Sequence, residues 1–151
     1  NHGSKAILMG TGEAKRELSR EFRGELPSGI KRAEVYCGGC VVVEGPTYEE
    51  ENDLGDRIAK SSSFDDWQIV VIHDNADLGL STDKFLWSTW TRFNPATDIY
   101  AREINLKNNH IGYASPIIID ARMKPWYPKE VKVRDDIAAL VDKRWDEYFP
   151  K

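Results

Sequence analysis

The 151-residue sequence lacks several features that would indicate a function. Its 21 basic residues are outnumbered by 25 acidic ones, so it has no basic surface for nucleic acid and no polybasic membrane tether. Its longest apolar runs, such as 116–119, fall far short of the roughly 20 residues of a membrane span. No glycine-rich loop matches a phosphate-binding or dinucleotide-binding fingerprint. We therefore expect a cytoplasmic protein with no nucleic-acid partner and no membrane partner.

Histidine and cysteine are also scarce. Residues 1–4 resemble the remnant of an expression tag, which sets His2 aside and leaves His73 and His110. Neither histidine has a serine or cysteine nucleophile in a recognisable setting, so no catalytic triad is indicated. Two histidines and two cysteines without a zinc-site spacing also give no reason to expect a metal site.

Aromatic residues, by contrast, are abundant, with five Trp, six Tyr and five Phe. In other respects the chain fits one ordinary domain, long enough to bury roughly 70% of its unfolded surface. An aromatic surplus indicates a large core, an interface, or a piece of a larger protein. We assign residues 5–151 to a single domain, because no internal repeat or low-complexity linker divides them.

The hydrophobic pattern alternates between strands and helices. This order predicts an α/β domain with a mixed, mostly buried sheet flanked by helices, and with a long C-terminal helix. Strands are expected at 30–36, 41–44, 67–73, 99–102 and 116–119, and helices at 13–23, from 47 to about 61, at 83–93 and at 133–148.

The helix at 83–93 should place Leu86, Trp90 and Phe93 on one face. Trp87 and Trp90 lie about 300° apart around that helix, at 100° per residue. We therefore expect one tryptophan in the core and the other facing a partner domain or subunit.

The segment Cys37-Gly38-Gly39-Cys40 is the most conspicuous motif. A thioredoxin-like pair needs its first cysteine at a helix N-terminus, but strand-forming valines follow Cys40. The two glycines instead favour a tight hairpin turn between strands, flanked by two reduced cysteines.

Two acidic segments have plain structural interpretations. Residues 74–77 follow a buried strand, where α/β proteins often place ligand groups, but Asn and Asp are also ordinary turn residues and no calcium-loop pattern is present. Residues 49–51 form the acidic first turn of a helix and complement its dipole.

Two blocks of sequence carry a resemblance to a known family. A buried strand at 67–73 is followed by Leu-Trp-x-x-x-Thr-Arg-x-x-Pro-x-x-Asp, and later by Asp-Ala-Arg-Met-Lys-Pro at 120–125. These blocks resemble the C-terminal domain of the UbiD family. Within that family, their sequences are most similar to those of anaerobic aromatic carboxylases such as phenylphosphate carboxylase subunits. The resemblance covers most of residues 26–130. The motif residues are Trp87, Thr91, Arg92, Pro95, Asp98, Asp120 and Pro125.

The resemblance implies a function that this chain does not perform alone. Members of the family reversibly carboxylate or decarboxylate aromatic and α,β-unsaturated acids, using prenylated FMN with a divalent metal (Mn or Mg) and potassium. Their Glu-Arg-Glu catalytic set and most flavin ligands lie in a preceding domain, and nothing in this sequence matches those motifs. We therefore expect a fragment of a larger carboxy-lyase that is inactive and binds no cofactor alone. Its partners would be the flavin-binding domain, sister subunits of a homo-oligomer or multisubunit complex, and a small aromatic substrate.

The resemblance also implies a position for substrate contact. In the family a loop of this domain helps to wall the substrate pocket, and the matching position lies between Ile99 and Pro116. The candidates there are Leu106, Ile111 and Tyr113 as apolar contacts and His110 and Asn105 as polar ones. The alternative is that residues 107–110 form a solvent-exposed tip. For Arg92 we expect a scaffold role, through pairing with Asp98 or Asp120.

Two further functions remain open on the sequence alone. The domain could be a non-catalytic assembly subunit on the same fold, which the coding sequence upstream of Lys5 would decide. A small thiol-redox protein built on Cys37 and Cys40 is the other. The aromatic substrate, the oligomeric state and the direction of the reaction are not specified by these residues.

Overall fold

The computed structural model describes residues 13, 17–128 and 133–149, and it contains a five-stranded mixed sheet in the order β1-β2-β3-β7-β4. Strands β2, β3 and β7 are parallel, and β1 and β4 close the two edges in antiparallel fashion. The predicted α/β class with a mixed sheet is confirmed. The strands are β1 Arg32–Cys37, β2 Cys40–Glu44, β3 Ile69–His73, β4 Ile99–Ala101 and β7 Ile117–Asp120.

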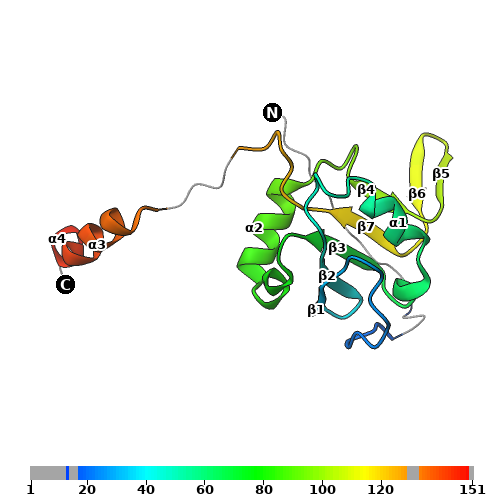
Figure 1. Ribbon diagram of the computed structural model, residues 1–151, viewed down its shortest axis with the longest axis horizontal. Coiled ribbons are helices and arrows are strands. Elements are labelled where there is room, and N and C mark those ends of the chain that lie inside the picture. Colours follow the sequence, from blue (N-terminus) through cyan, green and yellow to red (C-terminus); the bar gives the residue numbers. More distant parts are fainter. Residues whose placement is uncertain (1–12, 14–16, 129–132, 150–151) are drawn as a thin grey trace.

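Helices cover both faces of this sheet (Figure 1). On one face α1 packs Leu54 and Ile58 against a cluster that includes Val70 and Ile118. On the other face α2 packs Phe85 against Val71. Burial on both faces explains why the central strands are runs of valine and isoleucine rather than alternating sequences. The helices are α1 Leu54–Lys60, α2 Thr82–Arg92, α3 Asp135–Lys143 and α4 Trp145–Tyr148, with short 3-10 helices η1 Ser62–Phe64 and η2 Ala76–Leu80.

A second, two-stranded sheet projects from the edge of the first (Figure 1). Its strands are β5 Ile104–Lys107 and β6 His110–Tyr113. The turn between them places Asn108 and Asn109 at φ values of 51° and 63°, the left-handed conformation that asparagine tolerates and that tight hairpins require. This hairpin joins β4 to β7.

The turn between β1 and β2 is the tight hairpin that the sequence predicted. Cys37 pairs with Cys40 across Gly38 and Gly39, and Gly39 has a φ of 79°. The turn after Cys37 leads into a strand and not a helix, so the Cys37 thiol lacks the helix N-terminus that activates the first cysteine of a thioredoxin-like pair.

The helix predicted at 13–23 is wrong for the part that the structure describes. Residues 17–20 are irregular, because Leu18 and Phe22 are anchored at different places instead of lining one helical face. Leu18 lies against Gly38 and Gly39, whereas the Phe22 ring centroid is 5.4 Å from that of Phe64. Residues 14–16 lie outside the described part, as do residues 1–4, the segment that resembles a tag remnant.

The helix predicted to start near Thr47 begins later, at Leu54. Thr47 and Glu50 still contact each other there: Glu50 accepts hydrogen bonds from the backbone N–H and the hydroxyl of Thr47, both at 2.8 Å, and the Glu50 N–H donates to the Thr47 carbonyl at 3.2 Å. The bonds to its carboxylate hold the pKa of Glu50 below its usual value. Thr47 and Glu50 therefore stabilise a turn that precedes the helix by several residues.

The C-terminal helix is confirmed, with an interruption at Arg144 between α3 and α4. Neither helix buries a residue, and in Figure 1 both lie apart from the sheet domain. The apolar residues Ile137, Leu140, Val141 and Trp145 are exposed along them. None of the described helices has the length and apolar character needed to cross a membrane.

The predicted buried face of helix α2 is confirmed only in part, because Phe93 at its C-terminal end is buried in the core whereas Leu86 and Trp90 are exposed. Phe85, Ser88 and Thr89 face the sheet, while Leu86 is exposed. Neither tryptophan fills the core, since Trp87 is 73% exposed and Trp90 is 38% exposed. Beside Phe85, the residues of α2 that are buried are the small Ser88 and Thr89.

Candidate functional site

A network of buried charges occupies the edge of the sheet where the parallel strands end. Arg122 and Asp120 are both fully buried and form a two-pronged ion pair, with Nε–Oδ1 at 3.0 Å and Nη2–Oδ2 at 2.7 Å. The remaining guanidinium nitrogen, Nη1, donates to the carbonyl oxygens of Pro46 at 2.9 Å and Thr47 at 3.2 Å. The pair therefore fastens the end of β7 to the segment that follows β2.

A second buried cation, Lys124, completes this network. Its Nζ lies 3.0 Å from Asp98 Oδ2 and donates to the carbonyl oxygens of Asp120 at 2.8 Å and Arg92 at 3.2 Å. Asp98 in turn accepts a hydrogen bond from the backbone N–H of Asn94 at 2.7 Å. The end of α2, the start of β4 and the end of β7 are thereby tied together.

The sequence had suggested that Arg92 pairs with Asp98 or Asp120, and this prediction is wrong. Those carboxylates are taken by Lys124 and Arg122, and Arg92 Nη1 lies 3.3 Å from Asp74 Oδ2 instead. The same Asp74 oxygen accepts the backbone N–H of Met123 at 2.8 Å. The contact is still structural, because it links α2 to the turns after β3 and β7.

His73, at the end of β3, is 1% exposed. Its Nδ1 accepts the backbone N–H of Asp74 at 2.9 Å, while its Nε2 has no hydrogen-bond partner among the residues that the structure describes. Burial, assisted by the positive charges of Arg92 and Lys124, lowers the pKa of His73 to about 4. The imidazole is thus neutral at physiological pH.

The acidic segment after β3 has the turn role that the sequence favoured. Asn75 Oδ1 accepts the backbone N–H of Asp77 at 2.8 Å and so caps η2. Asp77 itself pairs with Arg32 on β1. Both side chains are used within the fold.

Most family-motif residues gather at this carboxyl edge. Arg92, Asp98 and Asp120 belong to the charge network described above, and Pro95 and Pro125 lie in the turns beside it. Thr91 donates its hydroxyl to the Trp87 carbonyl within α2, at 2.6 Å. Since each buried charge in the network has an opposite partner, its chemistry is that of a scaffold rather than of an acid or base poised to react.

The β5–β6 hairpin lies at the opposite, amino edge of the parallel strands, since it joins Ala101 to Ile117. Direct cross-strand partners share a face, and here Ile104 pairs with Tyr113 and Leu106 with Ile111. These four side chains form one apolar face, with Leu106 70% exposed. We call it the hairpin apolar face.

The hairpin divides the five predicted pocket residues. Leu106, Ile111 and Tyr113 share the apolar face, together with Ile104, which the sequence reasoning missed. Asn105 and His110 lie on the other face, with Lys107. The period-two alternation of apolar and polar residues in 104–107 was the signal that could have identified Ile104.

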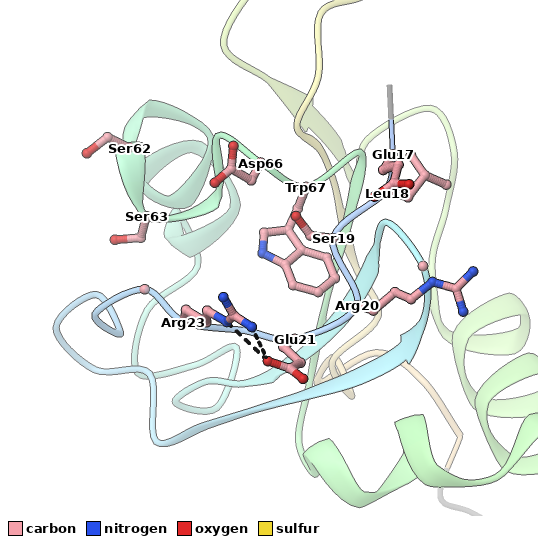
Figure 2. A pocket seen from close by; sticks show the side chains of 12 residues that line it. Glu17, Leu18, Ser19, Arg20, Glu21, Arg23, Ser62, Ser63, Asp66 and Trp67 are labelled. Carbon is pink, nitrogen blue, oxygen red and sulfur yellow. Dashed lines mark hydrogen bonds and ion pairs between the residues drawn. The ribbon is translucent and has the colours of Figure 1, made fainter. Parts of the chain in front are cut away.

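A groove opens at the same amino edge, with a volume of about 870 Å³ (Figure 2). Residues 17–24 form one wall, and 62–67 with Gly38 form the other. Arg23 is held by Glu21 at 2.7 Å, and the side chain of Trp67 points into the groove in Figure 2. The sequence contains no sign of this groove, because its first wall was expected to be helical. No group of three or more His, Cys, Asp or Glu side chains suited to a metal occurs in the part of the chain that the structure describes.

Comparison with known proteins supports the resemblance seen in the sequence. An uncharacterized protein of Chlamydia caviae is 40% identical over all of this chain and 26% of its own length. A 4-hydroxybenzoate decarboxylase subunit of Chlamydia pneumoniae is 37% identical over 99% of this chain and 25% of its own length. No protein-family model matches the chain.

The vanillic acid decarboxylase of Sedimentibacter hydroxybenzoicus, in its closed form, overlays on 76% of this chain and 27% of its own with a TM-score of 0.46 and 15% identity. A similarity this low carries no weight for function. The curated Chlamydia pneumoniae relative is named as a decarboxylase subunit, which agrees with the resemblance of the motif blocks to the UbiD family. The chain spans about a quarter of the length of the curated relatives that it matches.

Proposed function

We propose that this chain is the C-terminal, pocket-walling and assembly domain of an enzyme that reversibly carboxylates or decarboxylates aromatic acids. The observation that carries the proposal is the exposed hairpin apolar face. An isolated two-stranded hairpin is marginally stable in water, and one with an uncovered apolar face is expected to be covered by another surface.

The Chlamydia pneumoniae relative supports the substrate class. This 4-hydroxybenzoate decarboxylase subunit shares 37% of its residues with the chain over the matched region, so a hydroxylated aromatic acid is the substrate that we propose for the parent enzyme. That the relative is a subunit also supports a multisubunit or homo-oligomeric assembly. Three quarters of the relative lies outside the matched region, which leaves room for a flavin-binding domain.

The described residues do not fit the cofactor that the family implies. A divalent metal would need oxygen or nitrogen ligands gathered in one place, and the described residues contain no group of three or more His, Cys, Asp or Glu suited to a metal. The buried carboxylates Asp98 and Asp120 are taken by Lys124 and Arg122. We therefore propose that prenylated FMN, its divalent metal and potassium are held by the rest of the parent enzyme.

The chemical contribution of the hairpin would be exclusion of water. An apolar wall beside an aromatic carboxylate weakens its hydration, and this favours loss of CO2 over retention of the charged acid. Leu106 and Ile111 are the side chains best placed to form this wall, because they form a direct cross-strand pair on the apolar face.

The test uses the full-length parent enzyme loaded with its cofactor and assayed on 4-hydroxybenzoate. Leu106→Ser and Ile111→Ser should each lower kcat/KM by about tenfold, corresponding to about 1.4 kcal/mol. Lys107→Ser, on the opposite face of the same hairpin, is the matched control and should stay within twofold. Equal activities for all three variants would contradict the pocket-wall role.

The alternative, a non-catalytic assembly subunit, is favoured by one observation. The large apolar residues of α3 and α4 are exposed, which is the pattern expected of a surface that another protein or domain covers. The coding sequence upstream of this chain distinguishes the two functions, since only the enzyme requires a Glu-Arg-Glu domain there.

A further inference from the structure

The β1–β2 turn brings the only two cysteines of the chain into direct register. Direct partners in an antiparallel pair have Cα atoms about 4.5–5.5 Å apart, within the 4.4–6.8 Å range that a disulfide usually spans. Their side chains also project from the same face of the hairpin. Both thiols are free in this structure.

We propose that Cys37 and Cys40 are a site of reversible oxidation, where an intramolecular disulfide closes the β1–β2 turn. The two positions differ in access, because Cys37 is exposed and Cys40 is buried. Burial, with a smaller effect of the neighbouring Cys37, raises the pKa of the Cys40 thiol to about 12. Cys37 is therefore the thiol that meets an oxidant first, and Cys40 is the one that resolves the intermediate.

The oxidant that we name is a small disulfide such as oxidised glutathione. The Cys37 thiolate attacks one of its sulfur atoms, breaks the S–S bond and releases one glutathione thiolate, leaving a mixed disulfide on Cys37. Cys40 then loses its proton to solvent and attacks the Cys37 sulfur, which forms the Cys37–Cys40 bond and releases the second glutathione. Two protein thiols are oxidised, and one glutathione disulfide is reduced to two thiols.

The turn is connected to the groove at the amino edge of the sheet. The Gly39 N–H donates to the Ser19 carbonyl at 2.8 Å, and the Gly39 carbonyl accepts from Ile69 N–H at 3.0 Å. Gly38 lines the groove itself. A covalent bond across the turn would therefore fix one wall of this groove.

A metal site is the competing use of two neighbouring thiols, and the surroundings disfavour it. Structural zinc takes four ligands, whereas this turn supplies two. No third His, Cys, Asp or Glu joins them in a metal-binding group within the residues that the structure describes.

The test equilibrates the 151-residue chain in glutathione buffers from reducing to oxidising, then traps remaining thiols with N-ethylmaleimide before mass spectrometry. Because the chain has two cysteines, the assignment is unambiguous. The wild type should change from two maleimide groups to none, with the loss of two hydrogen atoms, and should run as a monomer on a non-reducing gel. Cys40→Ser should retain a glutathione adduct on Cys37, and Cys37→Ser should react at least tenfold more slowly than Cys40→Ser.

Three results would overturn the proposal. The wild type could end as a stable glutathione adduct, as a disulfide-linked dimer, or with both thiols still open to maleimide in the oxidising buffer. Equal reaction rates for the two single variants would refute the assigned order of attack. Circular dichroism of each variant under reducing conditions verifies that the fold itself is unchanged.

Discussion

Removing the Arg122 side chain should be the most damaging single change to this domain. Arg122→Met keeps much of the volume but leaves the Asp120 carboxylate fully buried without its two guanidinium bonds of 3.0 and 2.7 Å. It also removes the donor to the Pro46 and Thr47 carbonyls. Breaking a buried ion pair by removing one partner costs about 3–5 kcal/mol. For a domain of this size, that corresponds to a loss of about 10–15 °C in Tm.

Urea unfolding followed by tryptophan fluorescence measures this cost. With an m-value of about 2 kcal/mol/M, the transition midpoint should fall by about 2 M. Arg23→Met is the matched control, since Arg23 pairs with Glu21 at the surface and should contribute less than about 1 kcal/mol. Combining Arg122→Met with Asp120→Leu should recover much of the loss, because no unpaired charge remains. An Arg122→Met variant within about 1 kcal/mol of the wild type would refute the reasoning.

Three further changes test other parts of the fold. The pKa of His73 is about 4 in the folded chain and about 6.5 in the unfolded chain. Because only the unfolded chain binds a proton at His73 between these values, the free energy of unfolding reaches its full value above pH 6.5. That stability, roughly 3 kcal/mol, should be lost as the pH falls toward 4, and His73→Gln should flatten this slope in unfolding titrations. Gly39→Ala should lower stability by about 1–2 kcal/mol in urea unfolding, since φ is 79° and a Cβ would meet Gln68 Oε1 at 2.5 Å, whereas Gly38→Ala should cost less than half as much. Trp87→Gln should change stability by less than about 0.5 kcal/mol because the indole is 73% exposed; a larger loss would show that it packs within the domain.

The sequence predicted the sheet better than the helices. The segments 69–72 and 117–119 are short, continuous runs of β-branched apolar residues, the pattern of strands that are buried on both faces of a sheet. This local pattern was enough to assign them as strands. The tight turn at Gly38-Gly39 was equally well specified, because glycine supplies the positive φ that it requires. These elements are determined by residues that are neighbours in the sequence, so the sequence alone is enough to predict them.

The failures arose where a side chain had a distant partner. Leu18 and Phe22 have helical spacing, yet each contacts a different part of the chain, and this tertiary packing overrides the local pattern. Arg92 was expected to pair with Asp98 or Asp120 because it lies at a helix end before Pro95. The structure shows that Lys124, a buried cation that received no role, occupies Asp98. Which cation meets which carboxylate depends on register between strands, and the sequence does not contain that register.

The two edges of the sheet have different roles. In most α/β proteins ligands bind beyond the carboxyl ends of the strands, but here that edge is closed by Arg122, Lys124 and their carboxylates. The hairpin apolar face and the groove lie at the amino edge instead. In this domain, paired buried charges occupy the edge of the sheet where α/β proteins usually bind ligands, and apolar surface is exposed at the other edge. Such a domain is suited to completing a site on another domain. This arrangement supports the proposal that the reaction centre of a parent enzyme lies outside this chain.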